Sequence, residues 1–185
     1  MRKLSLWVAL LALAGCGEQP KPLPVLGEIP EFVLTDQQGK EFHASALKGK
    51  VWVANFIFTN CTGPCPRMSS RMMRLQGETA PFSQVKLVSF TVDPARDTPE
   101  VLAAYAKRFQ AEPGRWRFLT GPQAELHHLS REAFRVGNVD GSLNHSTHFV
   151  LVDQRERIRG YYGMSDGDAL ERLVRDIKRL LEASA

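Results

Sequence analysis

Hydrophobic and polar residues follow one another in blocks along the chain, and these blocks predict a series of strands and helices. The most apolar block covers residues 51–58, which read VWVANFIF and are rich in β-branched and aromatic side chains. A run of this kind predicts a strand that is buried on both faces of a sheet. Other apolar runs predict strands at residues 85–92, 117–120, 147–152 and 158–162, the last two as a hairpin around a turn at 153–156.

Helical periodicity falls between the predicted strands. Met68, Met72 and Leu75 are three or four residues apart and predict one face of a helix. Pro66 and Gly77 bound this helix, because proline is favoured at the first helical position and glycine at the end. Further helices are predicted at residues 97–109, with Asp97 or Thr98 as the cap, at 121–134, and at 168–181.

The alternation of strands and helices predicts an α/β fold, with a central mixed β-sheet flanked by helices on both faces. Residues 32–35 and 41–43 predict a β-hairpin around a polar turn, as an N-terminal extension of this sheet. Two cysteines follow the first central strand, which is the thioredoxin-like arrangement. The sequence therefore predicts one thioredoxin-like domain at residues 31–185.

The N-terminus has the pattern of an export signal. Residues 1–15 contain a basic start, an apolar run from Leu4 to Leu13 and small residues at the end, as in a secretory signal peptide. The run is too short to span a bilayer alone. The sequence LAGC at residues 13–16 resembles the bacterial lipobox, in which cleavage precedes a cysteine that then carries lipid.

We therefore expect a lipid on Cys16, followed by a proline-rich linker that includes residues 16–30. The domain would then be exported and anchored to a bacterial membrane, facing the periplasm or the cell exterior. Two alternatives stay open: a secreted protein with a stray cysteine, and a short anchor that is not cleaved.

Composition and charge exclude some classes of protein. The chain has 185 residues, of which 43% are hydrophobic and 24% charged, an ordinary globular composition with enough length for one core. Its formal charge of +4 falls to +2 once Arg2 and Lys3 are removed with the signal. So weak a charge, without any cluster of basic and aromatic residues, gives no support to nucleic-acid binding.

Cys61 and Cys65 are separated by Thr-Gly-Pro and lie between the predicted buried strand and the next helix. A helix N-terminus favours negative charge, and thiolate is the form of cysteine that attacks disulfides or binds soft metals. With Cys16 lipidated, the other two cysteines remain as a pair outside the cytosol, where working thiols need a reductant. A structural disulfide is the alternative, but it would close a very short loop and add little stability. We therefore expect metal or redox chemistry at this pair.

The three-residue spacing of the cysteines favours copper. The longer loop lets two sulfurs lie on two sides of a small ion, and Cu(I) is soft, accepts two or three ligands and prefers thiolate. The natural third donor is an imidazole from a separate loop, and His145 is the candidate. In thioredoxin-like redox enzymes a cis-proline usually begins the equivalent strand, whereas here Ser146 takes the matching position and a histidine precedes it.

Three separated segments carry a family resemblance: FTNCTGPCP at 58–66, TVDPARDTP at 91–99 and NHS at 144–146. Together they resemble the Sco/SenC family of copper-binding cytochrome c oxidase assembly factors, over about residues 30–181. The resemblance implies a thioredoxin-like fold, copper held by Cys61, Cys65 and His145, and a role in building the dinuclear copper centre of the oxidase. Family members commonly have proline directly after the first cysteine. This chain has Thr62 there, a change expected to alter loop stiffness and redox potential.

For several other side chains the sequence leaves two roles open. His148 is either a fourth donor or a hydrogen-bonded strand residue, and Asp93 either tunes the site or forms a turn with Pro94. Methionines on the first predicted helix are either soft copper ligands or core residues, and their spacing favours the core. These are Met68, Met72 and Met73. The remaining histidines are expected to be structural or solvated: His43, His127 and His128.

The leading functional hypothesis is a metallochaperone rather than an enzyme. It binds one Cu(I) per chain, with Cu(II) left open, and passes it to the copper-centre subunit of cytochrome c oxidase. Other copper carriers or thiol reductants are the further partners expected, together with the membrane through the N-terminal lipid. The rival hypothesis is a thiol–disulfide oxidoreductase that reduces the oxidase's copper-ligating cysteines, with Cys61 attacking and Cys65 resolving. A thiol peroxidase is a weaker third hypothesis, since no peroxidase-type motif is visible.

Overall fold

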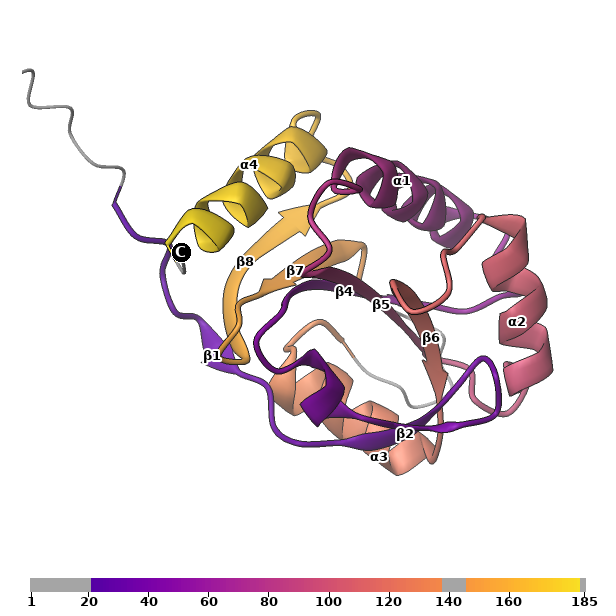
Figure 1. The fold of residues 1–185 in the computed structure, drawn as a ribbon. Coiled ribbons are helices and arrows are strands. Elements are labelled where there is room, and N and C mark those ends of the chain that lie inside the picture. The colour runs from indigo at the N-terminus through magenta and orange to yellow at the C-terminus, as the bar shows by residue number, and fades with distance from the viewer. Residues whose placement is uncertain (1–20, 138–145, 184–185) are drawn as a thin grey trace, which may run out of the picture.

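The computed structural model describes residues 21–137 and 146–183, and across these residues the central element is an eight-stranded mixed sheet (Figure 1). The order of the strands in the sheet is β1-β8-β7-β4-β5-β6-β2-β3. Their bounds are β1 Gly27–Glu28, β2 Val33–Asp36, β3 Glu41–His43, β4 Val51–Ile57, β5 Val85–Thr91, β6 Trp116–Thr120, β7 His148–Val152 and β8 Arg157–Gly163.

The central strand β4 corresponds to the most apolar run of the sequence, residues 51–58, and every one of its residues is buried. It pairs in parallel with β5, from Val51 opposite Val85 to Ile57 opposite Thr91, and antiparallel with β7 on its other side. A strand with neighbours on both edges and helices on both faces has no solvent-facing side, which is why its sequence does not alternate. The prediction of a doubly buried strand is confirmed.

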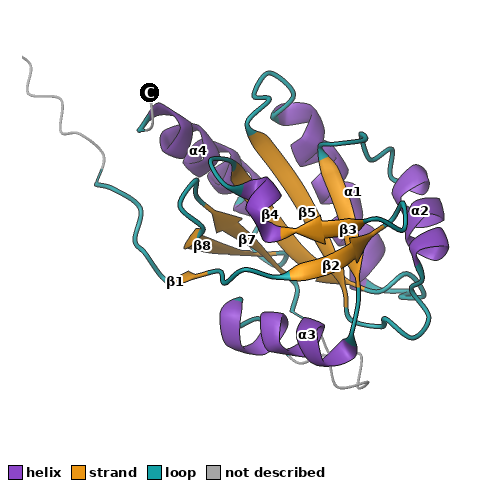
Figure 2. Ribbon diagram, turned by 60° about the horizontal axis from the view of Figure 1, so that its bottom comes forward, coloured by secondary structure: helices purple, strands orange, loops and turns teal. Residues whose placement is uncertain are grey.

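Helices cover both faces of the sheet (Figure 2). On one face α1, α2 and α4 close a core that contains Met68, Met72, Leu102 and Leu173. On the other face α3 closes a core with the aromatic side chain of Phe134. The bounds are α1 Pro64–Glu78, α2 Pro99–Arg108, α3 Gln123–His128 and α4 Ala169–Glu182, with a 3-10 turn, η1, at Ala44–Leu47 and a π-helical segment, η2, at Leu129–Ala133. The predicted thioredoxin-like α/β fold is confirmed, including the β2–β3 hairpin, which joins the sheet beside β6.

Helix α1 begins two residues before the predicted start at Pro66. Pro64 takes the first helical position and Gly63 caps the helix. Both prolines fit, because the first four N–H groups of a helix have no partner within it and a missing donor there costs nothing. As a result Cys65 lies inside the first turn of the helix rather than in front of it.

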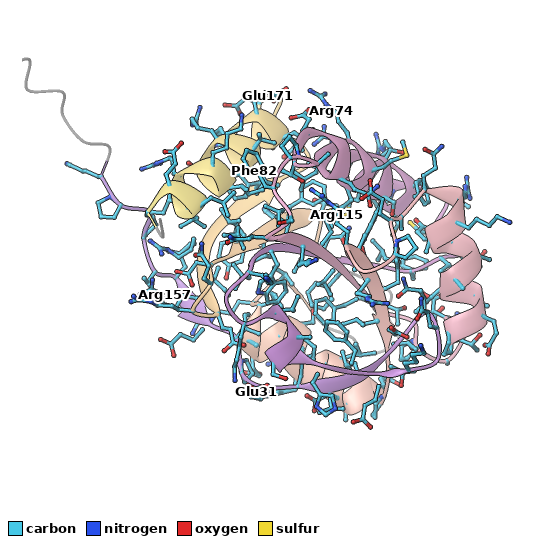
Figure 3. All side chains as sticks on the ribbon, in the orientation of Figure 1. Glu31, Arg74, Phe82, Arg115, Arg157 and Glu171 are labelled. Carbon is cyan, nitrogen blue, oxygen red and sulfur yellow. The ribbon has the colours of Figure 1, made fainter. Side chains whose placement is uncertain are left out.

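Packing of α1 against α4 supports the core reading of its methionines. Met68 and Met72 are fully buried, whereas Arg74 lies on the exposed side of α1. Arg74 is beside Glu171 of α4, with 3.5 Å between Nη2 and Oε1 (Figure 3). An exposed pair of this kind contributes little to stability, so burial of the apolar faces holds the two helices together.

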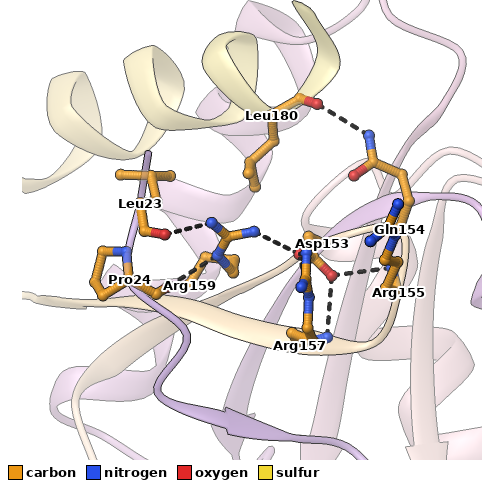
Figure 4. Close-up of polar contacts among 8 residues, drawn as sticks. All are labelled: Leu23, Pro24, Asp153, Gln154, Arg155, Arg157, Arg159 and Leu180. Atoms are coloured by element: carbon orange, nitrogen blue, oxygen red, sulfur yellow. Dashed lines mark hydrogen bonds and ion pairs between the residues drawn. The ribbon is translucent and has the colours of Figure 1, made fainter. Parts of the chain in front are cut away.

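Residues 21–30 lie along the edge of the sheet at β8. Strand β1 pairs with β8, Gly27 opposite Ile158, and the chain therefore joins the sheet before the predicted start of the domain. Arg159 donates hydrogen bonds to the carbonyl oxygens of Leu23 and Pro24 and forms an ion pair with Asp153 (Figure 4). No sequence pattern predicts β1, because a two-residue strand among prolines has no periodicity.

Candidate metal centre

The loop between β4 and α1 carries the two cysteines at the carboxyl end of the central strand. Cys61 is partly exposed and its backbone N–H donates to the carbonyl oxygen of Phe58 at 3.3 Å. Cys65 is fully buried in the core between α1 and the sheet. Both residues are thiols rather than halves of a disulfide. The predicted pair therefore has one accessible and one buried sulfur.

Burial controls the protonation of Cys65. The loss of solvent raises the pKa of its thiol from 9.0 to about 12; a hydrogen bond with the backbone at Phe58 opposes this rise, and the neighbouring Cys61 adds to it. The helix N-terminus was expected to favour a thiolate at this pair. At Cys65 the desolvation of a charged sulfur is the larger effect, so the thiol is protonated at neutral pH.

A buried hydroxyl pair lies in the same core as Cys65. The hydroxyl groups of Ser69 on α1 and Tyr105 on α2 are 3.1 Å apart. Burial raises the pKa of Tyr105 to about 12, and the hydrogen bond with Ser69 opposes that rise. Both residues occupy core-facing positions of their helices.

The loop after β5 reaches the cysteine loop through Asp97. Its carboxylate accepts a hydrogen bond from the Thr59 hydroxyl at 2.6 Å and another from the Thr91 hydroxyl at 2.5 Å. Asp93, in the same loop, is nearly buried and accepts from the Arg96 guanidinium at 2.9 Å. The carbonyl oxygen of Asp93 also accepts from the backbone N–H groups of Arg96 and Asp97, so its role in the turn is observed.

The predicted third ligand, His145, lies outside the described residues, as does Cys16. Strand β7 begins with His148, and its register places Val150 opposite Ala54 of β4. The start of β7 is therefore at the same end of the sheet as the end of β4. Among residues 21–137 and 146–183, no three His, Cys, Asp or Glu side chains are grouped as a metal site.

His148 is exposed, and its Nδ1 atom is 2.7 Å from the Ser146 hydroxyl, which agrees with the reading of a hydrogen-bonded strand residue. His43 is also exposed and pairs with Glu41 at 2.6 Å. His127 and His128 belong to α3, on the face of the sheet opposite to α1.

Within the part of the chain that the structure describes, no helix combines the length and the apolar character needed to cross a membrane.

Known proteins resemble this chain over nearly its whole length. The sequence model of the SCO1/SenC family matches residues 25–182. The SCO1 protein homolog of Bacillus subtilis is 32% identical over 184 residues, which cover 96% of this chain and 95% of that protein.

Solved structures of similar sequence share the fold. A SCO1/SenC family lipoprotein from Bacillus anthracis is 36% identical with a TM-score of 0.79, over 87% of this chain and 99% of that one. BsSco is described with a disulfide switch, as a member of the Sco family of cytochrome c oxidase assembly proteins. It is 32% identical with a TM-score of 0.75, over 85% and 96% of the two chains.

Arabidopsis thaliana ScoI, solved with copper bound, is 26% identical with a TM-score of 0.70, over 83% of this chain and 99% of that one. These likenesses extend over nearly the whole described domain, and the dithiol at the end of β4 lies within them. By sequence and by fold, the chain belongs to the SCO1/SenC family.

Proposed function

We propose that the protein is a membrane-tethered copper chaperone that binds one copper ion and delivers it to the dinuclear copper site of cytochrome c oxidase. The observation that carries the proposal is the pair of thiols, Cys61 and Cys65, at the carboxyl end of the central strand in a fold of this family. Copper binding in Arabidopsis ScoI and oxidase assembly in the family of BsSco support the choice of metal and recipient.

The donor chemistry at the dithiol suits Cu(I). Two sulfurs packed against an apolar core form a soft, poorly hydrated site, and thiolate is the protein ligand that Cu(I) prefers. Binding requires both thiols to lose protons, so the high pKa of Cys65 makes copper affinity depend on pH.

A third ligand from His145 completes the proposal. Support comes from strand order, since β7 lies beside β4 and begins at the end of the sheet where the cysteine loop follows Ile57. His145 precedes His148, the first residue of β7, by three positions and is therefore close in sequence to that end of the sheet. Imidazole as the third donor suits Cu(II) as well as Cu(I), so loss of His145 should weaken Cu(II) binding most.

Unequal exposure of the two sulfurs fits transfer to another protein. Cys65 is buried, but Cys61 and the exposed residues Asn60, Thr62 and Gly63 lie at the surface. A recipient's thiolate can therefore approach the metal from the side of Cys61, and a shell of three ligands leaves room for it. Transfer then proceeds by ligand exchange, with the release of Cys61 before Cys65.

The proposed tether is a lipid on Cys16. Residues 21–30 are held against β8, and the row Gly27, Ile158, Val152 and Trp52 runs across the sheet at the start of β4. The dithiol follows the other end of β4, about 16 Å further along the strand. The tether would therefore join the sheet, at Gly27, at the end opposite to the dithiol.

The second candidate is a thiol–disulfide oxidoreductase, and a specific observation favours it. The accessible Cys61 has the position of an attacking thiol, and the buried Cys65 that of a resolving thiol. The disulfide switch described for BsSco shows that a relative changes its redox state. In this function the partners are a thiol reductant and the copper-ligating cysteines of the oxidase.

Metal analysis and spectroscopy of the reduced protein without its signal peptide test the proposal. We expect one copper per chain, loss of tight Cu(I) binding in both Cys61→Ser and Cys65→Ser, and much weaker Cu(II) binding in His145→Ala. Tight Cu(I) binding by either cysteine variant contradicts the dithiol site. Unchanged copper affinity in His145→Ala favours the oxidoreductase. For the tether, Cys16→Ser should release a folded domain from membranes, and retention would indicate an uncleaved anchor.

A further inference from the structure

A fully buried carboxylate, that of Asp97, is bonded to the residue two positions before Cys61. The backbone N–H of Thr59 donates to Oδ2 of Asp97 at 3.1 Å, and the Thr59 hydroxyl donates to Oδ1 at 2.6 Å. The Thr91 hydroxyl, at the end of β5, donates to Oδ2 at 2.5 Å. One side chain therefore joins the ends of β4 and β5 at the point where the cysteine loop begins.

Asp97 does not serve as the cap of α2, although its position in the sequence suggests that role. Thr98 is the N-cap residue, and its hydroxyl accepts from the backbone N–H of Val101 at 3.4 Å. The backbone N–H of Asp97 itself donates to the carbonyl oxygen of Asp93 at 2.9 Å. The carboxylate is thus directed back toward the sheet rather than toward the helix.

The two cysteines are held by different means. Cys65 is fixed by the first turn of α1 and by complete burial. Cys61 lies in a loop, and the two residues that follow it, Thr62 and Gly63, are exposed and therefore not tightly packed. The side chain of Cys61 packs against the core, but its backbone is held by the residues just before it, and the charge-assisted hydrogen bonds of Asp97 act there.

We propose that Asp97 is a positioning residue for the dithiol. By holding Thr59, it fixes the chain before Cys61, so the separation of the two sulfurs changes only through residues 60–63. The inference deepens the proposed function, since copper binding and disulfide formation both need the sulfurs brought together. Without Asp97, the thiols spend less time at a bonding distance, which weakens Cu(I) binding and disulfide formation alike.

The test compares Asp97→Ala and Asp97→Asn in the full chain. Cu(I) affinity is measured by competition with a chromophoric chelator, and the dithiol–disulfide potential by equilibration with glutathione. We expect Asp97→Ala to lower the Cu(I) association constant and the equilibrium constant for disulfide formation by about tenfold each. In Asp97→Asn the amide oxygen still accepts from Thr59, so both constants should stay within about threefold of the original protein.

Asp36→Ala is the matched control. Asp36 is 4% exposed and accepts from the backbone N–H groups of Gln38 and Lys40 at 2.9 and 3.1 Å and from Arg117 at 3.0 Å. It lies on β2, three strands from β4 in the sheet order. Its loss removes a comparable buried carboxylate, and we expect lower stability with an unchanged potential and copper affinity.

If Asp97→Ala does not fold, Thr59→Val is measured in its place, because this substitution removes a single hydroxyl donor and keeps the side-chain volume. We expect a smaller shift in the same direction. The proposal is overturned if Asp97→Ala and Thr59→Val both keep the copper affinity and the potential of the original protein. It is also overturned if Asp36→Ala shifts these two quantities as much as Asp97→Ala does. Should the original protein bind no copper, the proposed function fails, but the potential still decides whether Asp97 positions the dithiol.

Discussion

Unequal reactivity of the two cysteines is the prediction that follows most directly from the site. In the reduced protein, iodoacetamide should label Cys61 and leave Cys65 almost untouched. Burial raises the pKa of Cys65 from 9.0 to about 12, which lowers its thiolate fraction near pH 8 by about 1000-fold relative to an ordinary thiol. A thiolate of higher pKa is intrinsically more nucleophilic, which reduces the effect of the pKa shift on the labelling rate to about 50-fold. Complete burial also blocks the reagent, so Cys65 should be labelled more slowly than Cys61 by at least this factor.

Peptide mass mapping after timed labelling between pH 7 and pH 10 measures both rates in one sample. Labelling in denaturant is the control, because unfolding removes the burial and should make Cys65 react like a free thiol. The rate at Cys65 should keep rising to the top of this range, since its pKa is higher than every pH sampled. Labelling of Cys65 in the folded protein at a rate close to that of Cys61 would refute the burial argument.

Three further predictions concern the metal and the fold. In the proposed site Cu(I) displaces the proton of Cys65, so the apparent affinity should rise at least about tenfold per pH unit between pH 7 and pH 9 in a competition assay; a flat profile contradicts this. Arg159→Ala leaves the carboxylate of Asp153, which is 2% exposed, without one of its cations and should cost about 2–4 kcal/mol in urea unfolding; conservative Arg159→Lys should lose less. Gly160→Ala places a Cβ atom 2.8 Å from the Tyr162 hydroxyl and should cost about 1–3 kcal/mol, whereas Gly77→Ala, with open space around it, should not destabilise the protein.

The ion pairs of Asp153 also determine in which direction its contribution to stability changes with pH. Burial by itself raises the pKa of this carboxyl, but hydrogen bonds from Arg157 and Arg159 outweigh burial, so the pKa is lowered overall. A carboxyl with a lowered pKa stabilises the fold at neutral pH and loses that contribution as the pH falls below its unfolded value. The loss of stability in Arg159→Ala should accordingly shrink in acid.

Much of the fold could be predicted because it depends on local patterns. The run at β4 contains no alternation, and its burial on both faces follows from that alone. Core positions of α4 follow from their helical spacing, and Leu170, Leu173 and Ile177 are all buried. Errors occur where two local signals compete: both Pro64 and Pro66 can start a helix, and the helix in the structure begins at the earlier one.

The candidate site was predictable in part for a related reason. Cysteine spacing and the position of Cys61 after a buried strand are readable along the chain, and the family resemblance adds His145. Which sulfur is buried could not be read, because it depends on how α1 lies on the sheet. Asp97 was equally hidden, since its sequence position suggests a helix cap while its carboxylate bonds a residue 38 positions earlier.

The sequence by itself determined the α/β order of elements, the doubly buried strand and the pair of thiols at its end, because each depends on residue type and short-range periodicity. The tertiary structure alone decided that Cys65 is buried and that its pKa is raised, that Asp97 holds Thr59, and that residues 23–28 lie against β8. These features depend on desolvation and on hydrogen bonds between residues far apart in the chain, and no local pattern carries that information.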